Sequence, residues 1–90
     1  MTGRRFIVRG RVQGVGFRYF AVQAARECGI VGTVRNLPDG SVEAFAEGSE
    51  RALSEFRARL ERGPSYASVT AVDEIDMNAT GRFKSFDVAF

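Results

Sequence analysis

A glycine-rich stretch near the start of the chain holds the residues best suited to chemistry. Its sequence is Gly10-Arg11-Val12-Gln13-Gly14-Val15-Gly16-Phe17-Arg18, with three glycines within seven residues. Glycines allow backbone turns that a side chain would obstruct. A loop that leads into a helix leaves several backbone N–H groups unpaired and pointing one way, which attracts phosphate. We therefore predict phosphate binding by the loop residues Gln13, Gly14, Val15, Gly16, Phe17 and Arg18.

Arg18 adds a permanent positive charge and a planar set of N–H donors that match phosphate oxygens. A purely solvated arginine is a less attractive interpretation, because a cation near a helix N-terminus opposes the helix dipole unless an anion lies between them. The chain contains no histidine. This excludes Ser–His and Cys–His nucleophilic pairs and histidine-ligated zinc. Catalysis must therefore work without a side chain that titrates near neutrality.

Asn36 is the second candidate for chemistry. It lies between an apolar segment and the turn Leu37-Pro38-Asp39-Gly40. Its carboxamide can donate and accept hydrogen bonds but cannot act as a base, so it could orient a water molecule. An asparagine in this position can also simply shape a turn, and the residues alone favour that interpretation.

Other polar residues have simpler interpretations. Cys28 is the only cysteine, so it forms no internal disulfide, and we interpret it as a small core residue rather than a reactive thiol. Asp39 is interpreted as a turn residue. Glu43 and Glu47 could form a carboxylate pair or a metal site, but a solvated strand face is the better interpretation. We predict neither a metal nor a cofactor.

Composition limits the protein class. The 90 residues are 44% hydrophobic and 27% charged, as in a soluble globular protein, and we expect a single domain over residues 1–90. The net charge of +2 gives no strong field that would attract nucleic acid or a membrane. No apolar run has the length of a signal peptide core or a membrane span. Together with the lone cysteine, this predicts a cytoplasmic protein.

The spacing of apolar residues predicts the elements that position these groups. Helical spacing predicts a helix over 17–28 and a second one that begins after Ser49, a good N-cap, and ends at Gly63. The expected buried stripe of the first helix is Phe17, Phe20, Ala21, Ala24 and Cys28, and that of the second is Leu53, Phe56 and Leu60. Alternation predicts strands over 5–12, 30–36, 41–47 and 68–77, and a short final strand that includes Phe86, Val88 and Phe90. The order β-α-β-β-α-β predicts an α+β, ferredoxin-like sandwich, with two helices packed on one face of a mainly antiparallel sheet and a short C-terminal strand added.

Two stretches together resemble the signatures of the acylphosphatase family. They read VRGRVQGVGFRYF over residues 8–20 and GTVRNLPDGSVE over residues 32–43. Their order and spacing fit that family, and the ferredoxin-like layout covers the whole chain. One departure is visible, because Thr33 stands where family members often carry a bulky aromatic residue. This position lies on a predicted strand, so the departure bears on packing more than on activity.

The resemblance implies metal-independent hydrolysis of acyl phosphates to a carboxylate and inorganic phosphate, with Arg18 and Asn36 as the catalytic pair. The chemistry is plausible because the departing carboxylate is stable and needs no general acid. Phosphoryl transfer depends mostly on positioning and charge stabilisation. Backbone N–H groups of residues 13–18 would hold the phosphate, Arg18 would neutralise its charge, and Asn36 would orient the attacking water. The implied partners are the small-molecule substrate and the phosphate product.

Two functions of other classes must be weighed against this one. The alternative is a non-catalytic module that binds phosphate or carbamoyl phosphate, since acylphosphatase-like domains occur inside larger maturation proteins. An RNA-binding RRM domain shares the strand order, and residues 14–20 overlap its RNP1 pattern. However, Val15 replaces the first RNP1 aromatic, and the stretch enters a helix instead of lying on a strand. We therefore expect no nucleic-acid partner and no membrane partner.

The last strand bears on assembly and on the site. Lys84 and Asp87 could protect its edge, and we expect a monomer on that basis. The chain end at Phe90 could also lie near the glycine loop, with its carboxylate paired to Arg18 when no substrate is bound.

Overall fold

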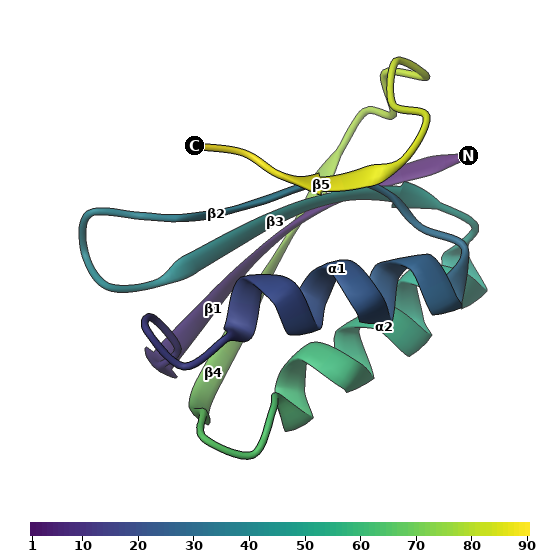
Figure 1. The fold of residues 1–90 in the computed structure, drawn as a ribbon. Coiled ribbons are helices and arrows are strands. Elements are labelled where there is room, and N and C mark those ends of the chain that lie inside the picture. Colours follow the sequence, from purple (N-terminus) through teal and green to yellow (C-terminus); the bar gives the residue numbers. More distant parts are fainter.

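The computed structural model describes residues 1–90 and forms a five-stranded sheet with two helices (Figure 1). The elements are β1 (Thr2–Arg11), α1 (Phe17–Cys28), β2 (Val31–Asn36), β3 (Val42–Gly48), α2 (Glu50–Arg62), β4 (Ser68–Met77) and β5 (Phe86–Val88). The strand order is β4-β1-β3-β2-β5, and only the β2–β5 pair is parallel. Both helices cover one face of the sheet, and the β4–β5 loop rises on the other. This confirms the predicted α+β, ferredoxin-like fold. Neither helix is long and apolar enough to cross a membrane.

Strand ends differ from the prediction where tertiary pairing decides them. β1 begins at Thr2 because its first residues pair with both β3 and β4. The third strand was expected to end at residue 47, but Gly48 also belongs to β3 and pairs with Thr2. Phe90 lies beyond β5 instead of within it. Pairing with a neighbouring strand outweighs the low strand propensity of a single glycine.

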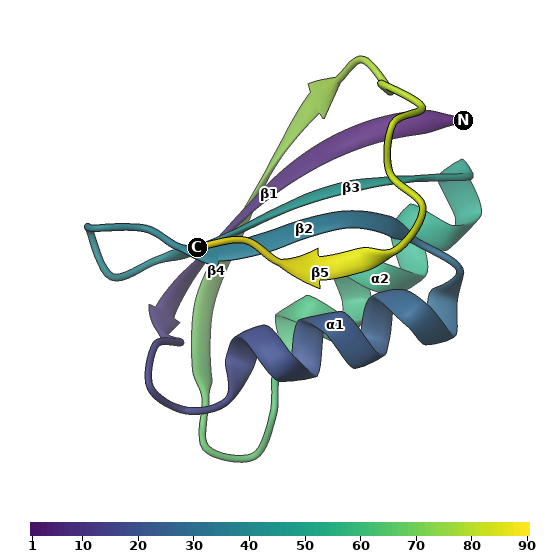
Figure 2. The same ribbon diagram turned by 45° about the horizontal axis from the view of Figure 1, so that its top comes forward.

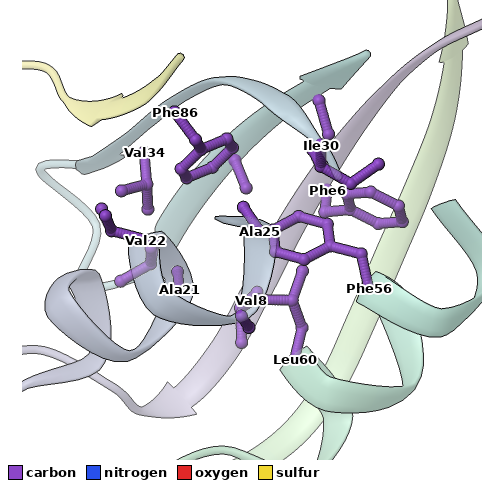
Figure 3. Packing of buried hydrophobic residues seen from close by; sticks show 14 of the residues in the cluster. Phe6, Val8, Ala21, Val22, Ala25, Ile30, Val34, Phe56, Leu60 and Phe86 are labelled. Carbon is purple, nitrogen blue, oxygen red and sulfur yellow. The ribbon is translucent and has the colours of Figure 1, made fainter. Parts of the chain in front are cut away.

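The hydrophobic core lies between the sheet and the helices (Figure 3). Phe56 of α2 packs between Phe6 of β1 and Phe86 of β5, with ring centroids 5.8 Å and 5.5 Å apart and edge-to-face geometry. Burial of each ring contributes about 1.5–3 kcal/mol, and each aromatic pair adds about 0.5–1.5 kcal/mol. The predicted buried stripe of α2, formed by Leu53, Phe56 and Leu60, is confirmed. This packing fixes the layer of helices against the sheet.

Helix α1 buries a wider face than its spacing predicted. Val22 and Ala25 are buried, whereas Phe20 and Cys28 are only half-buried. The difference arises because α1 contacts α2 on one side and strands β2 and β5 on the other. Burial raises the pKa of the Cys28 thiol, which supports its interpretation as a packing residue rather than a nucleophile.

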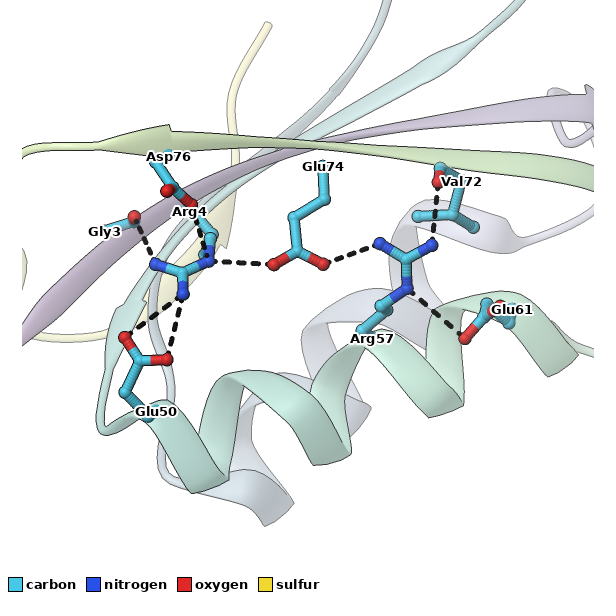
Figure 4. A network of polar contacts seen from close by, with 8 residues as sticks. All are labelled: Gly3, Arg4, Glu50, Arg57, Glu61, Val72, Glu74 and Asp76. Carbon is cyan, nitrogen blue, oxygen red and sulfur yellow. Dashed lines mark hydrogen bonds and ion pairs between the residues drawn. The ribbon is translucent and has the colours of Figure 1, made fainter.

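An ion-pair network connects α2 to strands β1 and β4 (Figure 4). It comprises Arg4, Glu50, Arg57, Glu61, Glu74 and Asp76. Arg4 donates to Glu74 and to Glu50 at 2.9 Å, and Arg57 donates to Glu74 at 2.6 Å. The Arg4 side chain is only 14% exposed, so water screens these pairs less than it screens isolated surface pairs. The network therefore attaches α2 to the edge strand β4.

The prediction that Glu47 lies on a solvated strand face is wrong. Its side chain is fully buried and accepts hydrogen bonds from Thr80 N at 2.7 Å, Thr80 Oγ1 at 2.9 Å and Gly81 N at 3.1 Å. The prediction was wrong because the β4–β5 loop folds over this part of the sheet, and strand alternation cannot reveal a covering loop. Glu47 is thus an anchor for that loop.

Glu43 is also less exposed than the predicted solvated strand face implied. Its side chain is 12% exposed and accepts from Arg5 Nε at 2.6 Å and from Arg35 Nε at 2.8 Å. Burial alone would raise the pKa of Glu43, but its two arginine partners outweigh burial and lower it. Ile7, opposite Glu43 in the β1–β3 register, is only 5% exposed. Ion-paired side chains therefore cover much of the outer face. No group of three or more histidine, cysteine or carboxylate side chains is arranged to hold a metal ion.

Replacement of Glu47 by glutamine should destabilise the fold in a pH-dependent way. Burial alone would raise the pKa of Glu47, but hydrogen bonds from Thr80 and Gly81 outweigh burial and hold the pKa below its ordinary value. Such a carboxylate stabilises the protein above its unfolded-state pKa, and this contribution is lost as pH falls through the folded-state pKa. We expect Glu47→Gln to lower the free energy of unfolding by about 1–3 kcal/mol near neutral pH, because an amide N–H₂ would face two N–H donors.

Urea denaturation across the pH range measures this effect. The difference between Glu47→Gln and the parent protein should shrink in acid, where Glu47 of the parent is protonated. Glu55→Gln, whose exposed side chain pairs only with exposed Arg51 at 3.7 Å, is the matched control and should change stability by less than about 0.5 kcal/mol. Equal losses in the two variants, or a Glu47→Gln loss that does not depend on pH, would contradict the role of Glu47 as a charged anchor.

Candidate active site

The glycine loop and the end of β2 lie at the same end of the fold (Figures 1 and 2). Helix α1 begins there at Phe17, and β2 ends there at Asn36. Val34 is buried in the core, and Asn36, two residues later, lies on the same face of β2, toward α1. Arg18 and Asn36 together line a pocket of 510 Å³. The fold thus brings the two predicted catalytic residues into one cavity.

Most of the predicted site residues line this pocket. They are Gly14, Gly16, Phe17, Arg18 and Asn36. Two members of the predicted phosphate-binding loop, Gln13 and Val15, do not line it. Val15 instead packs against the hydrophobic core and so attaches the loop to it.

The backbone of the loop presents unpaired N–H groups. Gly14 and Gly16 have φ angles of 74° and 77°, in the left-handed region that favours glycine. The first hydrogen bond of the helix runs from Phe20 N to Gly16 O at 3.0 Å. Backbone N–H groups of residues 14–19 donate to no acceptor in the protein. Such donors at the positive end of a helix dipole attract an anion.

Arg18 differs from the other half-buried arginines. Each of the other half-buried arginines pairs with a carboxylate at 2.5–2.9 Å; these are Arg4, Arg5, Arg57 and Arg59. Arg18 has no carboxylate within 4.0 Å and makes no side-chain hydrogen bond. Its guanidinium carbon lies 5.6 Å from the centre of the Phe90 ring, a cation–π contact. The chain end therefore does lie beside Arg18, but its ring and not its carboxylate makes the contact.

Asn36 has an unsatisfied polar atom. Its Oδ1 has an exposed area below 1 Å² and accepts no hydrogen bond. A buried carbonyl oxygen without a donor costs about 1–3 kcal/mol, so native folds seldom keep one without a functional reason. Because Asn36 also lines the Arg18 pocket, its carboxamide is a candidate to bind a donor such as a reacting water.

Gln13 holds the loop and the β2–β3 turn together. Its Nε2 donates to Leu37 O at 2.8 Å and to Ser41 O at 2.9 Å. Leu37 directly follows Asn36, so this side chain braces the loop against the segment that carries the carboxamide. Asp39 accepts from Ser41 N at 2.9 Å, which fits its predicted role in the turn. The sequence does not indicate that Gln13 braces the loop, because this role depends on two segments more than twenty residues apart in the chain.

The far end of the pocket is formed by side chains that sequence reasoning did not select. Val22 and Arg26 of α1 face Val88 of β5 and Asp87, with Arg26 Nη2 3.5 Å from Asp87 Oδ1. Asp87 lies on the edge strand β5, as expected, and it also forms this exposed pair beside the pocket. Only the pairing of β5 with β2 places these residues near α1. They leave room beyond the loop for a substrate group other than phosphate.

Comparison with known proteins agrees with this geometry. The acylphosphatase family model matches residues 4–88. The chain is 44% identical to an acylphosphatase from Archaeoglobus fulgidus over 90 residues, all of both chains. It is 47% identical to one from Mannheimia succiniciproducens over 88 residues, 98% of both chains. The crystal structure of acylphosphatase from Bacillus subtilis superposes with a TM-score of 0.95 at 38% identity, covering 100% of both chains. These findings confirm the predicted fold, family and enzyme class. The chain belongs to the acylphosphatase family.

Proposed function

We propose that the chain hydrolyses acyl phosphates to a carboxylate and inorganic phosphate, with Arg18 and Asn36 as the catalytic pair. The observation that carries this proposal is the half-buried guanidinium of Arg18, which has no carboxylate partner and shares a pocket with Asn36. Gly14 and residues 16–19, whose backbone N–H groups are unpaired, line the same pocket. Membership of the acylphosphatase family supports it independently.

The phosphate would be bound by charge and backbone donors together. N–H groups of residues 14–19 would donate to the nonbridging oxygens, and the Arg18 guanidinium would neutralise their charge. These donors are already in place before the substrate arrives, so little reorganisation is needed as charge shifts in the transition state. No protein nucleophile is required, because a bound phosphoryl group can be attacked directly by water.

Asn36 would orient that water. Its carboxamide would hold the water that attacks phosphorus opposite the acyl oxygen. Oδ1 is closed to solvent in the free protein, so the side chain would rotate to bring this oxygen to the water. The bond between phosphorus and the acyl oxygen breaks, and its electron pair leaves with the carboxylate. The proton lost by the water passes to an oxygen of the phosphate. The departing carboxylate needs no proton, which fits a chain without histidine.

The acyl group would extend toward Val22 and Val88 at the far end of the pocket. Tyr19, which also lines the pocket, is 70% exposed, so the pocket is open to solvent. Tight recognition is therefore concentrated on the phosphate. We expect the enzyme to accept acyl phosphates with a range of acyl groups.

Hydrolysis of benzoyl phosphate, followed by ultraviolet absorbance with and without EDTA, tests the proposal. Because no side-chain cluster is arranged to hold a metal, turnover should be unchanged by EDTA and inhibited competitively by inorganic phosphate. Saturable phosphate binding without turnover would instead favour the non-catalytic binding module.

A further inference from the structure

A second pocket lies on the outer face of the sheet, away from both helices. It has a volume of 470 Å³ and shares no residue with the Arg18 pocket. Its floor crosses three strands, because Phe45 of β3 is opposite Arg5 of β1 and Thr33 of β2. Thr33, the position at which the sequence departs from the family pattern, is small. The floor beside Phe45 is therefore hollow rather than filled by a side chain.

The loop after β4 forms the wall of this pocket. Met77, Thr80, Arg82 and Phe83 line it, and this loop rises from the outer face in Figure 1. The Phe83 ring lies 5.8 Å from the Phe45 ring, tilted by 47°. Buried Glu47 holds the loop in place through Thr80 and Gly81. The pocket thus has a fixed aromatic wall.

The polar groups of the pocket are mainly free donors. Glu43, its only carboxylate, accepts from Arg5 Nε with one oxygen and from Arg35 Nε with the other. The terminal nitrogens of Arg5 make no hydrogen bond in the protein. Arg82 has no carboxylate within 4.0 Å. The pocket consequently offers guanidinium N–H groups and aromatic faces, but no unpaired carboxylate that would repel an anion.

We propose that this outer pocket binds a small ligand that combines an aromatic ring with a phosphate, as a nucleoside monophosphate does. The ring would stack on Phe45 beside Phe83, above the small side chain of Thr33. Its phosphate would be bound by Arg5 and Arg82, whose planar guanidinium groups match phosphate oxygens. The volume of 470 Å³ is in the usual range for small-molecule sites.

An NMR titration of the full chain with AMP tests this proposal. The titration is done without inorganic phosphate and is repeated with Arg18→Ala, so that shifts caused by binding in the Arg18 pocket are identified by their loss. We expect amide shifts at Phe45, Arg82 and Phe83 that Arg18→Ala retains. Adenosine, which lacks the phosphate, and ribose 5-phosphate, which lacks the ring, should each bind at least about tenfold more weakly than AMP.

Variants separate this site from the catalytic pocket. Arg82→Ala should weaken AMP binding about tenfold and leave acyl phosphate hydrolysis unchanged. Arg62→Ala, which removes an exposed arginine outside both pockets, is the matched control and should change neither. Thr33→Trp should fill the floor and prevent binding, with folding checked by circular dichroism. The proposal is overturned if AMP does not bind, if its shifts map only to the Arg18 pocket, if ribose 5-phosphate binds as well as AMP, or if Arg62→Ala weakens binding equally.

Discussion

Arg18→Ala is expected to abolish phosphate binding and to lower acyl phosphate hydrolysis by about 10³-fold or more. An arginine that stabilises charge in phosphoryl transfer typically contributes a factor of about 10³–10⁵. In this chain no second unpaired guanidinium lines the pocket, because Arg26 is engaged by Asp87 at 3.5 Å. Steady-state kinetics with benzoyl phosphate and the inhibition constant of inorganic phosphate measure both effects.

The stability of Arg18→Ala distinguishes loss of chemistry from loss of structure. Arg18 makes no ion pair and lies in the first turn of α1, where a cation opposes the helix dipole. Its removal relieves this opposition but also loses the contact with the Phe90 ring, so the urea midpoint should change little. Arg18→Lys should keep part of the phosphate affinity, since it retains the charge but not the planar pair of donors. A phosphate inhibition constant that Arg18→Ala leaves unchanged would remove Arg18 from the site.

The secondary structure could be predicted because it depends on local spacing. Ser49, predicted as an N-cap, accepts from Ala52 N at 3.1 Å, and the apolar stripe of α2 is buried as expected. Glu47 could not be predicted in the same way. Its burial depends on the β4–β5 loop, more than thirty residues away in the chain. Alternation shows which side of a strand a residue occupies, but not what covers that side.

The site was predictable in part for a similar reason. The glycine loop and Arg18 are adjacent in sequence, so their combination is visible without a fold. Asn36 by itself was better explained as a turn residue, and only the strand order brings it to the start of α1. Gln13 was assigned to phosphate because of its place in the loop, yet its side chain binds the backbone of the β2–β3 turn. Roles that depend on two distant segments require the structure.

The positions of the charges explain why this site can be reactive in a small protein whose other half-buried arginines are paired with carboxylates. Arg4, Arg5 and Arg57 all support the fold through carboxylates. Arg18 and the unsatisfied Oδ1 of Asn36 do not support it. The Asn36 oxygen costs stability in the free protein, and Arg18 has only the Phe90 ring as a partner there. Both would find polar partners when a phosphate and a water are bound.

Asn36→Ala should separate binding from turnover. We expect kcat to fall by about 10²–10³-fold, the usual effect of removing one orienting or charge-stabilising group. The inhibition constant of inorganic phosphate should change less than about twofold, because Arg18 and the loop N–H groups remain; both are measured with benzoyl phosphate. Stability should not fall, since the variant removes a buried carbonyl oxygen that has no donor.

Asn36→Asp is the informative companion to the alanine variant. It has nearly the same shape, but its carboxylate would repel the phosphate, so both kcat and phosphate affinity should fall. The contrast between the two variants identifies the role of the carboxamide. If Asn36→Ala lost phosphate affinity in parallel with kcat, Asn36 would be a ligand of the phosphate instead. If its kcat were normal, the attacking water would have to be oriented by another group, and the backbone of the loop would be the next candidate because its N–H groups are the other unpaired donors at this site.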